Sequence, residues 1–283
     1  MIEIGKTHTL KVIKHVDFGV YLEGDTLEEI LLPERYLPDD VNTWEVGQSL
    51  EVFIYLDSED RTIATTEVPL AEVGECAYLS VVEKSEFGSF LDWGLMKDLL
   101  APFKEQRIPM DVGRSYVVYI YLDKTNRIAA SSLLSRYLDE QNEDIFQLGA
   151  EVDLLIASRS DLGYKAVING THLGLIHNNE IVRPISMGDE FKGYIGAARE
   201  DGRINLTLQK PAGELRGELA EKIIAYLEQN GGSSNLTDKS PPTDINAVFH
   251  VSKSNYKKAL GKLYKARKIT LENGRIMLSD KGR

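Results

Sequence analysis

The sequence predicts a mainly β protein: three tandem five-stranded barrels, followed by a small α/β domain with the element order of a winged helix. Three observations carry this prediction. A pattern of about seventy residues occurs three times, each copy shows the spacing of short strands, and the C-terminal residues change to helical spacing with strong positive charge. A chain of 283 residues is long enough for several small domains, each with its own core.

Each copy carries the same three markers in the same order. The first marker is a large side chain directly before a glycine and a second one two positions after it, at residues 17–22, 86–91 and 161–166. The second is a Val-Gly or Met-Gly pair, within residues 46–50, 112–116 and 187–191. The third is a polar turn, at residues 56–61, 122–127 and 198–203. Three markers that keep their order indicate a repeated domain.

Within each copy the residues are typical of short β-strands. In the first copy, residues 9–16 mix apolar and polar positions without helical spacing, and residues 51–56 are β-branched or aromatic. Five strands per copy are expected, and a sheet of that size avoids exposed edges by closing into a barrel. Gly19, Gly88 and Gly163 stand where a strand has to bend sharply. We expect barrels at 1–67, 68–135 and 147–210, with a linker at 136–146.

The remaining residues, 211–283, predict the winged-helix domain. Apolar residues between Leu215 and Leu227 recur at helical spacing, and the glycines that follow Asn230 end this first helix. A short second helix is expected through Ile245, Val248 and Phe249, after two prolines that suit a helix start.

A third helix and a hairpin complete the expected domain. The helix runs from Lys253 to Lys268 after Ser252 as its cap, and it is expected to bury Tyr256, Leu260, Leu263 and Tyr264. Residues 269–278 predict a hairpin with Asn273-Gly274 at its turn, which is the wing.

Positive charge is concentrated at the C-terminal end of the chain. The net charge is −11, yet residues 251–283 hold ten Lys or Arg and two acidic residues. Phosphate is bound by Lys and Arg, so this segment is the better candidate for contact with nucleic acid. The expected phosphate contacts are Lys253, Lys257, Lys258, Lys262 and Lys265. A solvated lysine face is the alternative, and the charge alone does not choose between DNA, structured RNA and an acidic partner.

The repeated markers resemble those of the S-one domain, an RNA-binding barrel with the OB fold. They include the aromatic residue before glycine, the second aromatic three positions on, a hydrophobic segment such as 174–177, and an Asp-x-x-x-Arg turn near the fifth strand. Three such domains followed by a winged helix resemble the bacterial conserved virulence factor B family over essentially the whole chain. The resemblance implies three OB-fold RNA-binding domains in tandem.

The resemblance also implies where single-stranded RNA lies: across one face of a barrel, where aromatic rings stack on bases and an arginine meets phosphate or base edges. The matching positions are Phe18, Tyr21, Asp57, Arg61, Phe87, Phe90, Asp123, Arg127, His177 and Arg203. No copy is complete. Pro33 and Pro102 stand where the third copy has its histidine, and the third copy has Leu162 and Lys165 at the stacking positions. The alternative is that the aromatic residues belong to the core and the arginines to solvated turns.

The leading hypothesis is a non-enzymatic, cytoplasmic RNA-binding protein that regulates gene expression after transcription. The main alternative is a DNA-binding transcription regulator whose acidic barrels contact other proteins. A nuclease is disfavoured because the chain has no Walker loop, no His-Glu-x-x-His motif and no Gly-x-Ser-x-Gly motif. We expect no cofactor, no metal, no secretory signal and no membrane-spanning segment. Protein partners and the oligomeric state stay open.

Overall fold

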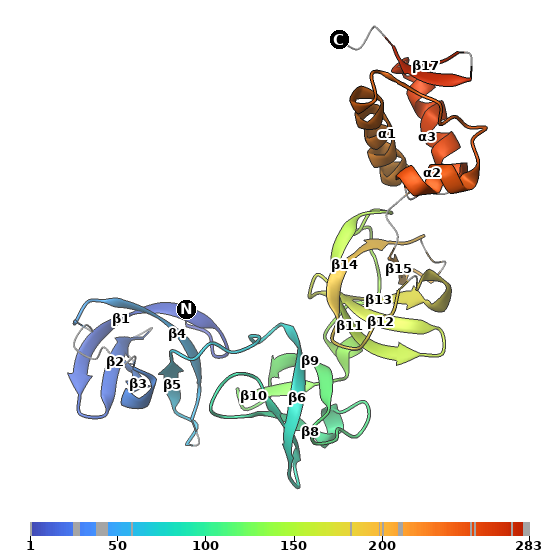
Figure 1. Cartoon of the computed structure of the whole chain (residues 1–283). Coiled ribbons are helices and arrows are strands. Elements are labelled where there is room, and N and C mark those ends of the chain that lie inside the picture. The colour runs from blue at the N-terminus through green and yellow to red at the C-terminus, as the bar shows by residue number, and fades with distance from the viewer. Residues whose placement is uncertain are drawn as a thin grey trace. The chain divides into compact units, whose positions relative to one another are not determined.

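Figure 1 shows a computed structural model of the chain. It describes residues 2–24, 29–37, 45–57, 59–181, 183–197, 199, 201–208, 212–249, 251, 253–272 and 274–279. The chain forms two compact units, Met1–Leu208 and Gln209–Arg283. The first unit contains the strands of three barrels, and the second contains the helices and short strands of the winged-helix domain, as the sequence predicts.

The first barrel is made of strands β1 to β5. They span Thr7–Val16, Gly19–Glu23, Glu29–Pro33, Ser49–Leu56 and Thr62–Thr65. Hydrogen bonds close the barrel in the order β1-β2-β3-β5-β4, in which only the β3–β5 pair among the described ladders is parallel. Successive side chains of a strand point to opposite faces, so Val12, Leu22, Leu32 and Ile54 meet in a buried core.

The second and third barrels repeat this arrangement. Strands β6 to β10 span Cys76–Lys84, Gly88–Asp92, Leu99–Pro102, Ser115–Leu122 and Ile128–Ser131. Strands β11 to β15 span Glu151–Ser160, Gly163–Ile168, His172–His177, Glu190–Ile195 and Ile204–Thr207. The third barrel closes as the first does, whereas β8 and β10 meet in the second as the two edges of a five-stranded sheet. The prediction of five strands per copy is confirmed.

A bulge and a glycine give each barrel its first sharp bend. The register of β1 shifts between Val12 and Lys14, and β6 and β11 shift at the corresponding places. At the turn that follows, a Cβ on Gly19 would overlap the carbonyl oxygen of Leu32. Gly88 and Gly163 lie equally close to the backbone of the opposite strand. Only glycine permits this approach, so the bends expected at the three glycines are confirmed.

Successive barrels share apolar contacts. Phe53 of β4 meets Trp93, which follows β7, with ring centroids 5.6 Å apart, and both rings belong to one cluster that continues into the core of the second barrel. Val117 of β9 and Leu155 of β11 belong to another cluster, which joins the second barrel to the third. Because these clusters exclude water between the barrels, residues 1–208 pack as a single unit.

The expected linker, residues 136–146, runs along the third barrel. Asp139 forms an isolated β-bridge with His172, and Gln141 forms one with Arg203. The backbone N–H of Leu173 donates to the carbonyl oxygen of Asp139 at 2.7 Å. These backbone contacts fix Glu140, which lies between the two bridging residues, beside the third barrel.

The second unit has the order of a winged helix. Helices α1, α2 and α3 span Ala212–Gln229, Pro242–Phe249 and Lys253–Lys265. Strands β16, β17 and β18 span Ser233–Ser234, Ile269–Glu272 and Arg275–Leu278 and pair in the order β16-β18-β17. Its core joins Leu219 of α1, Ile245 of α2, Tyr256 of α3 and Ile276 of β18. The Tyr256 hydroxyl donates to the carbonyl oxygen of Leu236 at 2.8 Å, which satisfies its one polar atom inside that core.

The third helix ends three residues earlier than expected. Arg267 has a left-handed conformation, with φ of 55°. The backbone N–H of Lys268 then donates to the carbonyl oxygen of Leu263 at 3.0 Å, which is the hydrogen bond of a Schellman cap. The helix therefore stops at Lys265 rather than Lys268.

The burial of Tyr264 was predicted wrongly. Tyr256, Leu260 and Leu263 form the buried face, and Tyr264, one residue beyond that face, is 55% exposed. The expected cap Ser252 and turn residue Asn273 lie outside the described residues. Within the described ranges, no helix is long and apolar enough to cross a bilayer.

Candidate nucleic-acid interface

The residue before each bend glycine is held with its side chain in solvent. Its carbonyl oxygen accepts a hydrogen bond from the backbone N–H that begins the 3-10 turn after the third strand. The pairs are Phe18–Glu34, Phe87–Phe103 and Leu162–Asn178, at 2.9, 3.2 and 3.0 Å. The three side chains Phe18, Phe87 and Leu162 are 55%, 66% and 64% exposed. The positions that the repeat matches in sequence are therefore equivalent in structure.

In the first barrel, two aromatic rings share one face. The ring centroids of Phe18 and Tyr21 lie 6.4 Å apart in an edge-to-face arrangement, although residues three apart in a regular strand point to opposite faces. Phe18 lies in the turn before β2, which brings its ring to the side of Tyr21. The Lys14 Nζ lies 4.4 Å from the Tyr21 ring centroid and also pairs with Glu29. This face offers rings for stacking and a lysine for phosphate.

The corresponding face of the second barrel has two rings but carries more negative charge. Phe87 is exposed and Phe90 is half-buried. Glu83 lies opposite Phe90 in the β6–β7 ladder, as Lys14 lies opposite Tyr21 in the first barrel. Burial, together with the carboxylates of Asp92 and Glu83, raises the pKa of Asp98 above its usual value. Negative charge repels phosphate, so this face is electrostatically less suited to RNA than the first.

Asp57 and Asp123 shape the turns before the fifth strands. The Asp57 Oδ1 accepts hydrogen bonds from the backbone N–H groups of Glu59 and Arg61 at 2.8 and 3.0 Å. The Asp123 Oδ1 accepts them from Thr125 and Arg127 at 2.7 and 3.1 Å. Burial raises the pKa of each carboxyl, but these hydrogen bonds and the nearby arginine outweigh it, so both pKa values are lowered. Each carboxylate is directed at its own turn and positions the arginine that follows.

Arg61 and Arg127 are both engaged in ion pairs. The Arg61 Nη2 lies 2.7 Å from the Asp57 Oδ2, within the same turn. Arg127 places its Nε and Nη2 each 2.7 Å from the carboxylate oxygens of Asp60, which belongs to the first barrel. The planar end of Arg127 thus links the second barrel to the first, and RNA contact by this residue requires the pair to open.

The third barrel gathers three cations around one pocket, together with the carboxylates of Glu140 and Asp161. This pocket of about 310 Å³ is lined by Leu162, Lys165, Arg199 and Arg203, among other residues. Glu140 reaches this pocket from the preceding segment: its Oε1 lies 2.8 Å from Lys165 Nζ and its Oε2 lies 3.3 Å from Arg203 Nη2. The hydrogen bond from Lys165 lowers the pKa of Glu140. One carboxylate therefore occupies the position between two cations where a phosphate would fit.

His177 lies at the rim of the same barrel. It faces Gly163 in the β12–β13 ladder, as Pro33 faces Gly19 and Pro102 faces Gly88 in the other barrels. The His177 Nε2 lies 3.0 Å from the Asn205 Oδ1. Since that oxygen is an acceptor, the Nε2 carries the proton and the ring is oriented by Asn205.

The lysines of α3 form a separate basic surface. Lys257, Lys258, Lys262 and Lys265 are exposed and lie outside the buried face that contains Tyr256. Lys253 is half-buried, and its Nζ donates to the carbonyl oxygen of Lys239 at 3.4 Å. Within the first unit the predicted residues are thus distributed over all three barrels, and within the second unit they lie on α3.

The structure adds two arginines that were not among the predicted site residues. Arg199 forms a bidentate pair with Asp201 at 2.8 and 2.7 Å and lines the cationic pocket. Arg159 follows the bulge of β11 and is exposed. His15 and Lys84 occupy the same place after the bulges of β1 and β6, so a recurring basic position was a signal available in the repeat. In the part of the chain that the structure describes, no cluster of His, Cys, Asp and Glu is suited to a metal ion.

Comparison with known proteins places these features in a family. The S1 (S-one) domain family matches residues 4–67 and 73–133, and the CvfB-like winged helix domain family matches residues 221–278. Uncharacterized protein YitL of Bacillus subtilis is 32% identical over 281 residues, which cover 95% of this chain and 92% of YitL. Conserved virulence factor B of Staphylococcus saprophyticus is 25% identical over 294 residues, which cover 99% of this chain and 95% of that protein.

This chain belongs to the conserved virulence factor B family. Its S1 and winged-helix domains are nucleic-acid-binding, non-catalytic domain types. A solved multidomain protein with nucleic acid binding domains from Streptococcus pneumoniae is 24% identical, with 97% of this chain and 98% of that chain covered and a TM-score of 0.38.

Proposed function

We propose that this member of the conserved virulence factor B family is a non-enzymatic RNA-binding protein that regulates transcripts after their synthesis. The observation that carries the proposal is the first barrel face, where Phe18, Tyr21 and Lys14 lie together. An aromatic ring stacks on any base and contributes roughly 1–3 kcal/mol per base. Bases in a duplex are already stacked on each other, so such a face favours an unpaired strand. Regulation then follows from occupancy of the transcript, without a chemical step.

The other proposed contacts are divided by chemistry. Phe87 and Phe90 stack bases on the second barrel, with Arg127 available once its pair with Asp60 opens. His177 and Arg203 act on the cationic third face. Arg61 supplies charge on the first face, and the turn carboxylates of Asp57 and Asp123 hold the arginines in place. The α3 lysines add phosphate contacts that do not depend on base sequence.

A competition experiment tests this proposal. A fluorescent oligouridine of about 20 nucleotides, long enough for more than one OB fold, is bound to the full chain and displaced by unlabelled single-stranded RNA, single-stranded DNA or duplex DNA of equal charge. Single-stranded RNA is expected to compete best, because stacking needs unpaired bases and a 2′-hydroxyl adds contacts. Failure of the full chain to bind the oligouridine in low salt overturns the proposal.

A second candidate function is supported by the winged-helix domain. Its α3 carries exposed lysines and is followed by the β17–β18 hairpin, the arrangement in which a helix enters a duplex groove. In that case the protein is a DNA-binding transcription regulator, and the barrels contact other proteins. Duplex DNA then displaces the labelled strand better than RNA of equal charge does.

A further inference from the structure

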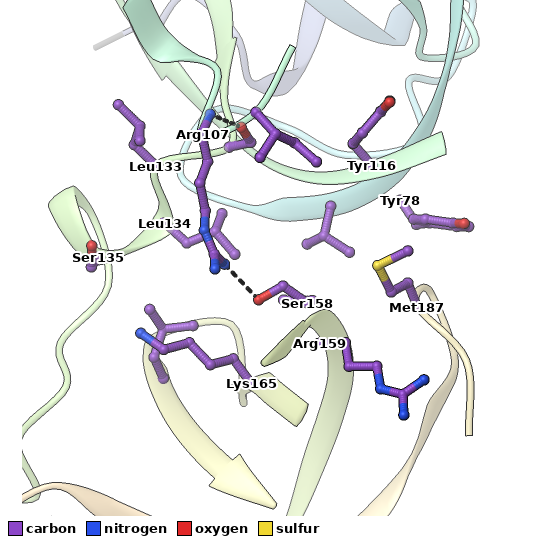
Figure 2. A pocket seen from close by; sticks show the side chains of 15 residues that line it. Tyr78, Arg107, Tyr116, Leu133, Leu134, Ser135, Ser158, Arg159, Lys165 and Met187 are labelled. Carbon is purple, nitrogen blue, oxygen red and sulfur yellow. Dashed lines mark hydrogen bonds between the residues drawn. The ribbon is translucent and has the colours of Figure 1, made fainter. Parts of the chain in front are cut away.

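A second pocket lies between the second and third barrels, within the unit Met1–Leu208 (Figure 2). Its volume is about 310 Å³, which is at the lower end of the range of small-molecule sites and of the right order for one nucleotide. Tyr78, Tyr116 and Leu134 line it from the second barrel and the segment after it, and Met187 lines it from the third. These residues give the pocket aromatic and apolar walls.

Three cations also line this pocket, from both sides. Arg107 comes from the second barrel, and Arg159 and Lys165 come from β11 and β12 of the third. None of the 15 described lining residues is acidic, although the whole chain has a net charge of −11. Lys165 also pairs with Glu140, whereas the two arginines supply positive charge without such a partner. A lining with cations and no acid, in an acidic protein, is the environment of an anion site.

The two arginines of the pocket are available to a ligand. Arg107 donates from Nη1 to the Ser158 hydroxyl at 2.8 Å, which leaves its other guanidinium N–H groups uncommitted to a carboxylate. Arg159 lies over the ring of Tyr164 at 5.7 Å. Among the described residues, neither arginine forms an ion pair with an acid. A phosphate therefore displaces no salt bridge when it binds to them.

We propose that this pocket binds one nucleotide of a single RNA strand that passes from the second barrel to the third. The base lies against the apolar and aromatic wall with Tyr78 and Tyr116, and its phosphate is held by Arg107 and Arg159. This inference rests on the proposed RNA-binding function, and it adds a binding position that belongs to neither barrel face alone.

The place of this pocket along the RNA strand follows from the adjacent pocket on the third barrel. Lys165 and Leu173 line both this pocket and the cationic pocket on the face of the third barrel. The two pockets are therefore contiguous, and a strand that leaves the first meets Arg199 and Arg203 in the second. Tyr78 packs on the backbone of Gly188, where a Cβ would overlap its ring, so the aromatic wall is fixed by contact between the two barrels.

The first test removes charge at Arg159. The variant Arg159→Gln is compared with Arg183→Gln, because Arg183 is also an exposed arginine of the third barrel, lies over the ring of Phe191 at 4.3 Å, and is absent from the residues lining the pocket. Binding of the oligouridine of about 20 nucleotides is expected to weaken roughly two- to tenfold in Arg159→Gln, and the salt slope to fall by about 0.7. Arg183→Gln is expected to bind as the wild type does.

The second test adds an acid to the pocket. Ile108 and Val112 are apolar residues of the second barrel with matched exposure, 58% and 56%, but only Ile108 lines the pocket. Ile108→Glu is expected to weaken binding more than Val112→Glu, with equal thermal stability of the two variants. If the two variants of each pair bind the oligouridine with equal affinity while the wild type still binds it, the proposed nucleotide pocket is overturned. Loss of binding by the wild type itself is the separate result that overturns the proposed function and the pocket together.

Discussion

The turn residue Phe18 and the strand residue Tyr21 contact each other but differ in burial. Phe18 is fixed by its backbone carbonyl and leaves its ring in solvent, whereas Tyr21 is half-buried beside Lys14. Burial of apolar surface stabilises a fold, and an exposed ring contributes little of it. Removal of the Phe18 ring therefore separates binding from stability better than removal of Tyr21.

We expect the double variant Phe18→Ala, Tyr21→Ala to weaken single-stranded RNA binding by roughly 2–5 kcal/mol, because two base-stacking contacts are lost. Phe18→Ala alone is expected to lower affinity without lowering the melting temperature. Affinity is measured by fluorescence anisotropy and stability by thermal unfolding. Val46→Ala, a truncation of another exposed side chain of the first barrel, is the control. A fall in stability with unchanged affinity identifies the two rings as structural.

The Glu140 carboxylate resembles an RNA phosphate, because it is an anion bound between two cations. It bridges Lys165 and Arg203 on the third face, so it neutralises cations that phosphate would otherwise meet. The backbone bridges of Asp139 and Gln141 hold it in place. Nucleic acid that uses this face has to displace the carboxylate.

We expect Glu140→Gln to bind single-stranded RNA more tightly than the wild type and to steepen the salt slope by about 1.4, since two cations are released and each contributes about 0.7 on a single strand. Glu143→Gln removes the same charge from an exposed position of the same segment and is the matched control. Equal affinity and salt slope in the two variants contradict a role of Glu140 in covering the third face.

The effect of Glu140→Gln on the free energy of unfolding is expected to depend on pH. The pKa of Glu140 is lowered in the folded state, mainly by Lys165, so its ion pairs stabilise the fold above the ordinary pKa of 4.5. That contribution is lost as pH falls through the lower, folded-state pKa. It amounts to about 0–1 kcal/mol because the partners are partly exposed. Denaturation between pH 6 and pH 3, compared in the wild type and Glu140→Gln, is expected to show a shallower loss of stability in the variant.

Helix α3 has one apolar face that is buried and one face of lysines that is exposed. Its buried face, with Tyr256, Leu260 and Leu263, is part of the domain core, and its other face exposes lysines. Like charges on one helix face repel each other and lower its stability slightly. Neutralisation of those lysines is therefore compatible with an intact domain.

We expect Lys257→Gln, Lys258→Gln to flatten the dependence of log affinity on log salt by roughly 1.4 on single strands and 1.8 on duplex, because each phosphate contact releases counterions. The loss is expected on every base sequence. Lys222→Gln, Lys239→Gln removes the same charge from exposed positions of the domain outside α3 and is the control. If the α3 variant keeps the full slope on RNA and on DNA, the helix surface makes no phosphate contact.

Features set by local sequence patterns were predictable, and contacts between distant residues were not. Strands, bend glycines and the winged-helix order were predictable because alternation, turn residues and helical spacing act locally. The exposure of Tyr264 was not, since a shift of one residue on a helix changes the face. The pairing of Arg127 with Asp60 and of Glu140 with Lys165 joins residues far apart in sequence, and no local pattern specifies such contacts. The turn role of Asp57 and Asp123 was visible in part, because Asp is common where its side chain accepts from nearby N–H groups.

Across residues 1–208, hydrophobic clusters extend from one barrel into the next. The cluster that contains Phe53 and Trp93 joins the first two barrels, and the one that contains Val117 and Leu155 joins the second to the third. The described core of the second unit is a cluster of its own, formed by residues between Leu219 and Leu278. Cooperative unfolding follows shared buried surface, so the two units are expected to behave differently.

We expect calorimetry of the full chain to show two transitions, one for residues 1–208 and one for the winged-helix domain. A chain that ends at residue 208 is expected to keep the first transition at an unchanged temperature. Trp93→Ala is expected to lower only that transition, by roughly 3–5 kcal/mol of unfolding free energy, because it opens a cavity where the first two barrels meet. Three independent transitions within residues 1–208 contradict shared cores.

The clusters between barrels also determine how several weak sites combine. A strand held by one barrel presents its next segment to the following barrel at a local concentration set by a fixed separation, and not by free diffusion. Each later contact then costs less ordering entropy than a first contact from solution, so avidity increases with strand length until the packed barrels are filled. Strands too short to reach a second barrel obtain none of this gain. The packing that stabilises the fold would thus also discriminate among RNA ligands by length.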